Sequence, residues 1–276
     1  MSTLSAKVTA FRELHVPGAP FVLANAWDLG SAKVLAALGA RALATSSAAF
    51  AFTLGRPDGG TVSRDEALAH AETLAAHTNL PVSGDFENGF GDAASDCADT
   101  VRLSIDAGLA GLSIEDISFP DGAPYPFGAA VERIGAAADA AGDRIVLCAR
   151  ADGMMTGHYG LDEAIRRLRA FSKAGAEVLY APLPPRREDI ATICQAVDRP
   201  VNVLVAGQFA TMTTADLASA GAARISFGSA LARVTHRALL DAASAALKGG
   251  DFSPFLNGAS GDSIDMLLRA HAEVTA

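Results

Sequence analysis

The sequence predicts an α/β protein of the (β/α)8 TIM-barrel class, and three observations support this prediction. First, 50% of the 276 residues are hydrophobic but only 6% are aromatic, which is typical of a core built from Ala, Val, Leu and Ile. Second, one pattern recurs at 38–45, 107–114, 174–181 and 220–227: a helical stretch ends at a glycine, and an apolar strand follows. Third, four more short apolar runs alternate with these junctions.

Together, these runs predict eight strands. They lie near residues 21–25, 42–45, 82–84, 111–114, 145–149, 178–181, 201–204 and 224–227. The runs are too apolar to alternate between a buried and an exposed face, which indicates parallel strands covered on both sides. Eight such units in a chain of this length favour a closed barrel over an open sheet.

The segments between the strands carry helical signals. Residues 161–174 place large apolar side chains on one stripe, as an amphipathic helix does. Ser63 and Glu66 have the spacing of a capping box, which predicts a helix from there to about His77. Residues 213–216 repeat that spacing with an aspartate, ahead of the seventh helix.

No linker or change of composition divides the chain, so we expect one domain over 1–276, with the barrel at about 20–248. Residues 2–14 form an amphipathic helix that could close the base of the barrel. The C-terminal segment, 249–276, is a loop rich in Gly, Ser and Pro followed by a helix from about residue 262. A helix on such a tether can pack on its own barrel or be exchanged between subunits.

The bulk properties exclude several classes of protein. A net charge of −9 and the lack of a basic run argue against a nucleic-acid partner. No apolar run approaches the roughly 18 residues that span a bilayer, so we expect no membrane segment. Cys97, Cys148 and Cys194 are odd in number and lack a CxxC spacing, and the chain opens without a signal peptide. A reducing cytoplasm is the expected location.

Two acids follow the third predicted strand. Asp85 and Glu87 are two residues apart in a loop rich in glycine, so their side chains project to the same side of the frayed strand end. Like charges this close repel unless a proton or a cation lies between them. Mg²⁺, which is held by one or two carboxylates plus water, is the usual cation for such a pair. The plain alternative is an exposed acidic turn.

The carboxyl ends of the other strands favour the metal site. In a barrel these ends meet at one mouth, which is where barrel enzymes build their active sites. Strand four ends at Glu115 and strand five at Arg150, so an arginine joins the acids. Strand two ends at Ser46 and Ser47, whose hydroxyl and backbone N–H groups suit a substrate carboxylate.

Taken in order, the motifs resemble those of the isocitrate lyase/phosphoenolpyruvate mutase superfamily. The resemblance covers almost the whole barrel. Each motif is weak alone, but this many in register are specific. They are Asn25-Ala26-Trp27-Asp28, Thr45-Ser46-Ser47, Leu54-Gly55-Arg56-Pro57-Asp58-Gly59, Asp85-x-Glu87-x-Gly89-Phe90-Gly91, Gly111-Leu112-x-Ile114-Glu115-Asp116, Ala149-Arg150-x-Asp152 and Pro200-Val201-Asn202.

The resemblance implies a Mg²⁺-dependent barrel enzyme that makes or breaks a C–C or C–P bond next to a 2-oxo acid through an enolate-like intermediate. Within the superfamily, the chain resembles the phosphonomutase-like branch or an oxaloacetate decarboxylase. The resemblance also implies roles for individual residues by position. We expect a homo-oligomer, either a dimer or a tetramer. By position, Asp85 and Glu87 would hold the metal, Glu115 and Asp58 would support it, Ser46, Ser47 and Ala48 would bind the carboxylate, and Arg150 and Asn202 would face the substrate.

Two departures from the family pattern are informative. The lyases of this superfamily carry a loop with Lys, Cys and His after strand four, whereas 117–128 holds none of these residues. The Phe-Pro-Glu motif of strand six is replaced by Tyr180-Ala181-Pro182, so a substrate-binding glutamate is also missing. Isocitrate or 2-methylisocitrate cleavage by the usual route is therefore disfavoured. We expect 118–128, rich in Gly and Pro, to act as a lid.

Three other functions stay open at this point. One is a 2-methylisocitrate- or isocitrate-type lyase with an atypical gating loop. Another is a sugar-phosphate isomerase or aldolase that holds phosphate with the loops at 205–207 and 227–229, although no catalytic lysine or histidine ends a strand as expected. The last is a barrel that binds a carboxylate without catalysis.

Overall fold

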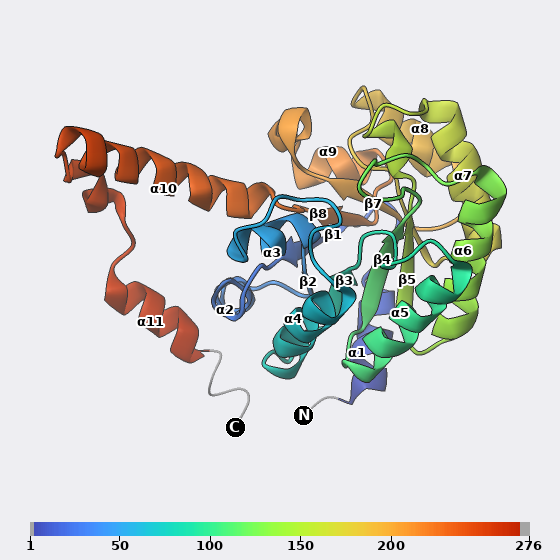
Figure 1. Cartoon of the computed structure of the whole chain (residues 1–276), viewed down its shortest axis with the longest axis horizontal. Helices are drawn as coiled ribbons and strands as arrows, with labels where there is room; N and C mark the ends of the chain where they lie inside the picture. Colours follow the sequence, from blue (N-terminus) through green and yellow to red (C-terminus); the bar gives the residue numbers. More distant parts are fainter. Residues whose placement is uncertain (1–2, 271–276) are drawn as a thin grey trace.

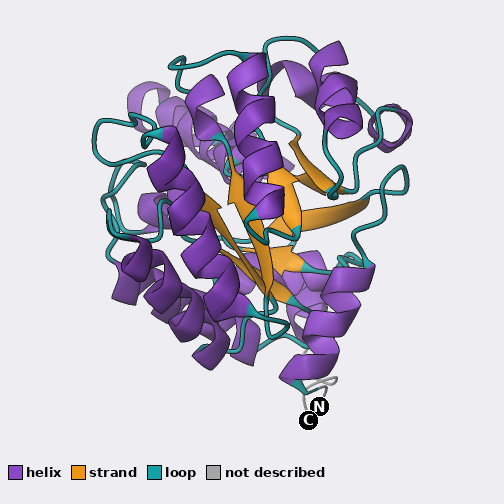
Figure 2. Cartoon of the chain, turned by 90° about the vertical axis from the view of Figure 1, so that its right-hand side faces the viewer, coloured by secondary structure: helices purple, strands orange, loops and turns teal. Residues whose placement is uncertain are grey.

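The computed structural model describes residues 3–270, which form a closed barrel of eight parallel strands paired in sequence order (Figures 1 and 2). The predicted barrel is confirmed, and each predicted run contains a strand. The strands are Phe21–Asn25 (β1), Leu43–Ala44 (β2), Val82–Asp85 (β3), Gly111–Glu115 (β4), Val146–Arg150 (β5), Val178–Tyr180 (β6), Val201–Leu204 (β7) and Arg224–Ser226 (β8).

Helices surround the strands (Figure 2). They are Leu4–Glu13 (α1), Leu29–Ala37 (α2), Ser47–Thr53 (α3), Arg64–Ala76 (α4), Ala94–Asp106 (α5), Phe127–Ala141 (α6), Leu161–Lys173 (α7), Glu188–Ala196 (α8), Thr214–Ser219 (α9), Ala230–Gly249 (α10) and Gly261–Ala270 (α11). Both predicted capping boxes are present, at the starts of α4 and α9. Within the described residues, no helix combines the length and apolar character that crossing a membrane requires.

The register of the central strands places the site residues side by side. Asp85 at the end of β3 pairs with Ser113 of β4, and Glu115 at the end of β4 pairs with Arg150 of β5. The carboxyl ends of β3, β4 and β5 therefore bring two acids and the arginine to one rim of the barrel.

Helix α1 closes the base of the barrel, as expected, although Ser2 lies outside the described residues. Phe11 is fully buried and packs in one cluster with Phe21, Leu23 and other lumen residues. A Cβ on Gly111 would lie 2.5 Å from the Phe11 ring, so this strand position requires glycine.

Helix α3 was not expected, because the segment after the second strand reads as a loop. Ser46 is its N-cap, and the Ser46 hydroxyl accepts a hydrogen bond from the backbone N–H of Ala49 at 3.3 Å. Three alanines, good helix formers, follow in a helix of seven residues. Such a short helix shows too little periodicity to be recognised in sequence.

The chain leaves the barrel after β8. Helix α10 extends away from the barrel (Figure 1), and Ala232 is its only residue that is buried. Helix α11 follows and contacts α2; its expected end, beyond residue 270, lies outside the described residues. An apolar groove of about 420 Å³ lies on the barrel wall beside β1, lined by residues that include Val22, Leu38 and Phe227. We call α10, α11 and the segment between them the C-terminal arm.

Candidate active site

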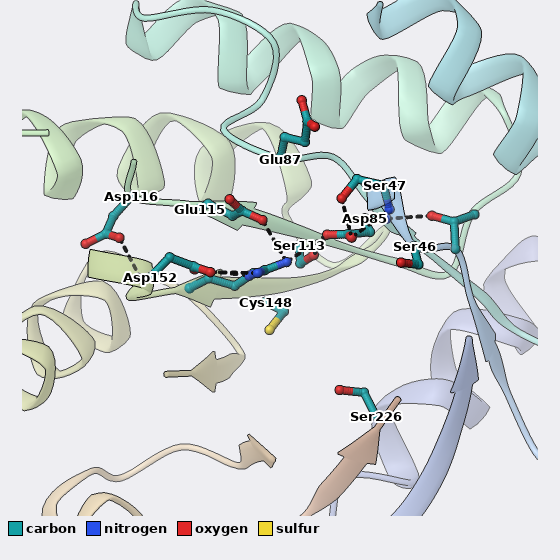
Figure 3. Close-up of polar contacts among 12 residues, drawn as sticks. Ser46, Ser47, Asp85, Glu87, Ser113, Glu115, Asp116, Cys148, Asp152 and Ser226 are labelled. Atoms are coloured by element: carbon teal, nitrogen blue, oxygen red, sulfur yellow. Dashed lines mark hydrogen bonds and ion pairs between the residues drawn. The ribbon is translucent and has the colours of Figure 1, made fainter. Parts of the chain in front are cut away.

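Asp85 ends β3 at the mouth of the barrel, and both of its carboxylate oxygens are engaged (Figure 3). Oδ1 accepts hydrogen bonds from Nη1 of Arg150 at 2.8 Å and from Oγ of Ser113 at 3.1 Å. Oδ2 accepts from the backbone N–H of Ser47 at 2.9 Å and from its Oγ at 3.0 Å. Donors from three neighbouring elements therefore fix the orientation of one carboxylate.

Arg150, at the end of β5, contacts three carboxylates. Its guanidinium lies 2.8 Å from Asp85, 2.8 Å from Glu115 and 2.6 Å from Asp152. The contact with Asp152 is bidentate, since Nε also donates to the second oxygen at 3.1 Å. The guanidinium also lies over the ring of Tyr180, 4.9 Å from its centre. This arrangement orients a permanent positive charge at the mouth.

The electrostatics of this cluster are set by burial. Burial raises the pKa of Glu115 well above its usual value, and Arg150 opposes that rise. Burial also raises the pKa of Asp152 to about 6, again against Arg150. For Arg150, burial lowers the pKa, but the carboxylates outweigh it and hold the pKa well above its usual range. The cluster carries more acids than one guanidinium can neutralise.

Asp85 and Glu115 lie in a row, with Glu87 on one side of it and Cys148 on the other (Figure 3). Glu87 is buried, its φ of 45° is unusual for a residue other than glycine, and its Oε1 accepts from the backbone N–H of Gly60 at 3.0 Å. Burial raises its pKa to about 7, and the charges of Asp85 and Asp58 add to the rise. Burial and Asp85 likewise raise the pKa of Asp58. The structure therefore brings Asp58, Asp85 and Glu87 close enough to repel.

The predicted carboxylate-binding residues begin α3. The backbone N–H and the hydroxyl of Ser47 both donate hydrogen bonds to Asp85. The Ser46 hydroxyl caps the helix by accepting a hydrogen bond from the backbone N–H of Ala49. Ala48 follows on the first turn and is buried. These residues border the mouth next to Asp85, so the sequence located them correctly in space. Their binding role stays a prediction.

Asn202 lies in the lumen of the barrel and lines one chamber with Asp85 and Arg150. Its Nδ2 donates to Oγ of Ser226 at 2.9 Å, and its Oδ1 accepts from Nε of Arg224 at 2.8 Å. Each of these bonds uses only part of the capacity of the amide, which has two N–H donors and two lone pairs. A role for Asn202 in facing the substrate stays a prediction.

Sequence reasoning missed a buried network behind Arg150. Asp116 accepts from Tyr159 at 2.8 Å, from Arg167 at 2.9 Å, and from the backbone N–H of Asp152 at 2.8 Å. Asp152 in turn holds Arg150. Arg167 interrupts the apolar face of α7, and a charged residue at such a core position is the signal that could have revealed the network.

Comparison with known proteins shows the family of this chain. The family model described as phosphoenolpyruvate phosphomutase matches residues 11–247. The chain belongs to this family. Among its relatives, 2-methylisocitrate lyase of Escherichia coli (strain K12) is 34% identical, over 67% of this chain and 66% of that protein. The 2,3-dimethylmalate lyase of Eubacterium barkeri is 29% identical, over 83% of this chain and 82% of that protein.

Solved structures of the phosphoenolpyruvate phosphomutase family share the architecture. A protein from Burkholderia cenocepacia J2315, provisionally described as a lyase/mutase, is 42% identical, with a TM-score of 0.90 over 95% of this chain and 96% of that one. A 2,3-dimethylmalate lyase structure, described as a member of the PEP mutase/isocitrate lyase superfamily, is 25% identical, with a TM-score of 0.82 over 99% of this chain and 98% of that one.

The donor set of this family member fits Mg²⁺. No three His, Cys, Asp or Glu side chains among residues 3–270 are placed to hold a metal ion by themselves. Mg²⁺ does not need such a cage, because one or two carboxylates, water and substrate oxygens complete its octahedral shell. Burial is the main cause of the raised pKa of Glu87, and the charges of Asp85 and Asp58 add to it. A divalent cation bound between these carboxylates would relieve their repulsion.

The raised pKa of Glu87 predicts a pH-dependent stability in the metal-free protein. In the unfolded chain this carboxyl titrates near 4.5, so between 4.5 and about 7 the folded state binds more protons and stability falls as pH rises. Glu87→Gln is therefore expected to stabilise the protein by about 1–3 kcal/mol at pH 8, and by less at pH 5. Urea unfolding at both pH values measures this, with Glu132→Gln on the exposed side of α6 as control. Equal responses of the two variants would contradict it.

Proposed function

We propose that this chain is a Mg²⁺-dependent enzyme that makes or breaks a C–C or C–P bond adjacent to the 2-oxo group of a small carboxylate, through an enolate-like intermediate. Its reaction is of the phosphonomutase or oxaloacetate decarboxylase kind. The observation that supports this most is the single rim on which Asp85 and Glu115 both contact Arg150, with Glu87 beside them.

Metal binding and charge stabilisation would be carried out by different residues. Asp85 and Glu87 would hold Mg²⁺, with Asp58 and Glu115 supporting the site. The ion, when bound, supplies positive charge to the oxygens of a 2-oxo acid. Arg150 adds a second, preorganised positive charge where negative charge develops. Because Arg150 is tied to three carboxylates, it needs little reorganisation during the reaction.

The loop after β4 is suited to exclude water from this site. Its residue Phe119 packs against the loop that donates to Glu87: a Cβ on Gly60 would lie 2.8 Å from the Cβ of Phe119. We propose that residues 118–126 form the lid, since α6 already begins at Phe127. A closed lid would protect the enolate-like intermediate from protonation by solvent.

A lyase of the 2-methylisocitrate type is the second candidate. The 34% identity to the Escherichia coli 2-methylisocitrate lyase favours it. The loop at 117–128, which contains no Cys, Lys or His, argues against the usual route. Assays with 2-methylisocitrate and oxaloacetate, run side by side on the same preparation, distinguish the two candidates by the product released.

Oxalate tests the proposed site, because it mimics the carboxylate and enolate oxygens of a 2-oxo acid. Calorimetry is expected to show oxalate binding that requires Mg²⁺. Asp85→Asn should weaken it by more than the roughly 10–100-fold that loss of an outer-shell partner costs. Asp99→Asn, on the exposed part of α5, is the control and should leave the affinity unchanged. Binding without Mg²⁺, or equal affinity in Asp85→Asn, would refute the metal site.

We propose that the protein is a homo-oligomer in which the C-terminal arm covers a neighbouring subunit. Large apolar side chains on the arm are exposed, among them Leu239, Leu247 and Leu256 at 63%, 87% and 87%. The apolar groove beside β1, which Leu35 of α2 also lines, offers a complementary surface. Light scattering is expected to give a dimer or a larger assembly, and Leu239→Glu with Leu247→Glu should lower the mass. A monomeric wild type would refute this.

The expected location is the cytoplasm, and we retain it as a proposal. Cys97, Cys148 and Cys194 are free thiols, which a reducing compartment preserves.

A further inference from the structure

Arg224 is a buried positive charge in the barrel lumen, below the mouth. Arg224 is only 3% exposed, and it forms no ion pair with any of residues 3–270. Its hydrogen-bond partners are Oδ1 of Asn202 at 2.8 Å, Nε2 of His15 at 3.3 Å and Sγ of Cys148 at 3.0 Å. A buried charge without a counter-charge is costly, so this guanidinium is the least compensated cation of the lumen.

The partners of Arg224 do not carry the missing negative charge. Burial, and then the charge of Arg224, lowers the pKa of His15 to about 3, so this ring is neutral at physiological pH. Burial raises the pKa of Cys148, so its thiol stays protonated. The amide of Asn202 is neutral in any case. Arg224 therefore has no counter-charge among the side chains that it contacts.

A chamber of about 40 Å³ lies next to Arg224, inside the barrel. Its wall includes Tyr180, Ser83 and Ser226, which supply hydroxyl groups, and Asp85 and Arg150 at the upper end. The Tyr180 hydroxyl has no hydrogen-bond partner within the described part of the chain, so it is free to donate into the chamber. A cavity needs about 10–15 Å³ of such volume to hold one water molecule, so the chamber has room for a very small ligand.

The chamber meets the proposed metal site only at its upper end, where Asp85 lines it. Figure 3 shows Cys148 and Ser226 on one side of the row formed by Asp85 and Glu115, and Glu87 on the other. Both oxygens of Asp85 are already bonded to donors outside the chamber's lower end. The lower part of the chamber is therefore rich in donors and contains the uncompensated guanidinium, which is the chemistry of an anion site.

We propose that this chamber binds one carboxylate-sized monoanion, held by the guanidinium of Arg224 and the hydroxyl of Tyr180. A single negative charge balances Arg224. The anion is either a free ion or the second carboxylate of a substrate whose first carboxylate lies at the mouth. The site does not depend on the proposed metal chemistry, because neither Arg224 nor Tyr180 is among the residues proposed to hold Mg²⁺.

Formate, the smallest carboxylate, is the probe. Titration of the wild-type protein, followed by thermal unfolding and by calorimetry, is expected to show saturable binding at one site. Arg224→Met should weaken formate binding by about tenfold or more, because a charged hydrogen bond is lost. Tyr180→Phe should weaken it by a smaller factor, and it serves as the deciding variant if Arg224→Met fails to fold. Arg199→Met, an exposed arginine ahead of β7, is the matched control and should bind formate as the wild type does.

Absence of saturable formate binding, or equal affinity in the wild type and Tyr180→Phe, overturns the proposal. If formate does bind at one saturable site, a competition experiment identifies the source of the anion. If oxaloacetate displaces formate and oxalate does not, the site receives a substrate's second carboxylate. If neither displaces formate, the site binds a free anion. Formate binding needs neither Mg²⁺ nor turnover, so this test can succeed even where the oxalate test of the proposed function fails.

Discussion

Arg150→Met is expected to lower the free energy of unfolding by about 3–5 kcal/mol at pH 7.5, because it leaves three buried carboxylates without their common partner. The side chains of Asp85, Glu115 and Asp152 are 16%, 7% and 0% exposed, so solvent cannot replace the guanidinium. The same variant should lower turnover by about 10²–10³-fold, the cost of losing one preorganised charge at the reacting centre. Urea unfolding and steady-state kinetics measure the two effects.

The loss of stability in Arg150→Met should also depend on pH. Burial raises the pKa of Glu115 and of Asp152, and Arg150 opposes both rises. Without the arginine these two pKa values rise further above those of the unfolded chain, so stability should fall as pH increases from about 5 to 8. Arg166→Met is the control: this arginine pairs with Glu163 on the exposed side of α7, and such pairs contribute about 0–1 kcal/mol. A loss for Arg150→Met no larger than that of the control would show that the cluster is not a coupled unit.

Arg167→Met is expected to cost about 3 kcal/mol, the lower end of the range for breaking a buried ion pair. The cost is limited because Tyr159 and the backbone N–H of Asp152 continue to donate to Asp116. Since Asp116 positions Asp152, and Asp152 holds Arg150, turnover should fall as well, although Arg167 lies outside the mouth. Urea unfolding measures the stability, and Mg²⁺-dependent oxalate affinity measures the site.

The same exposed neighbour serves as control for this second variant. Arg166 and Arg167 are adjacent in sequence and both contact Glu163, but the side chain of Arg166 is 58% exposed and that of Arg167 is 6% exposed. Arg166→Met should leave both oxalate affinity and stability nearly unchanged. If Arg167→Met unfolds more easily but binds oxalate with wild-type affinity, the network is structural and does not position Arg150.

Local signals in the sequence were sufficient for the barrel. The junction glycines at Gly39, Gly108, Gly175 and Gly221 all adopt positive φ, the conformation that ends a helix before the next strand. The capping box at Ser63 begins α4 as predicted. These features act within a few residues, so a single sequence displays them.

Features that depend on distant residues were harder to predict. Helix α3 is too short to show a period, and the direction of the C-terminal arm depends on what its apolar face meets. The sequence placed Asn202 at the mouth; the structure shows it lining one chamber with Asp85 and Arg150, and it adds hydrogen bonds to Arg224 and Ser226 that the sequence did not predict. A strand's period of two identifies the inward side of a residue, but not how deep in the barrel its side chain ends.

The sequence by itself determined the eight-stranded barrel and the set of acids and arginine at its mouth, because strand order places the carboxyl ends of parallel strands on one rim. Only the tertiary structure decided which of these groups are bonded to one another. It joined Arg150 to Asp85, Glu115 and Asp152, and it left Arg224 without a counter-charge. The physical reason is that burial and pairing set the energy of a charge, and both depend on residues far apart in the chain.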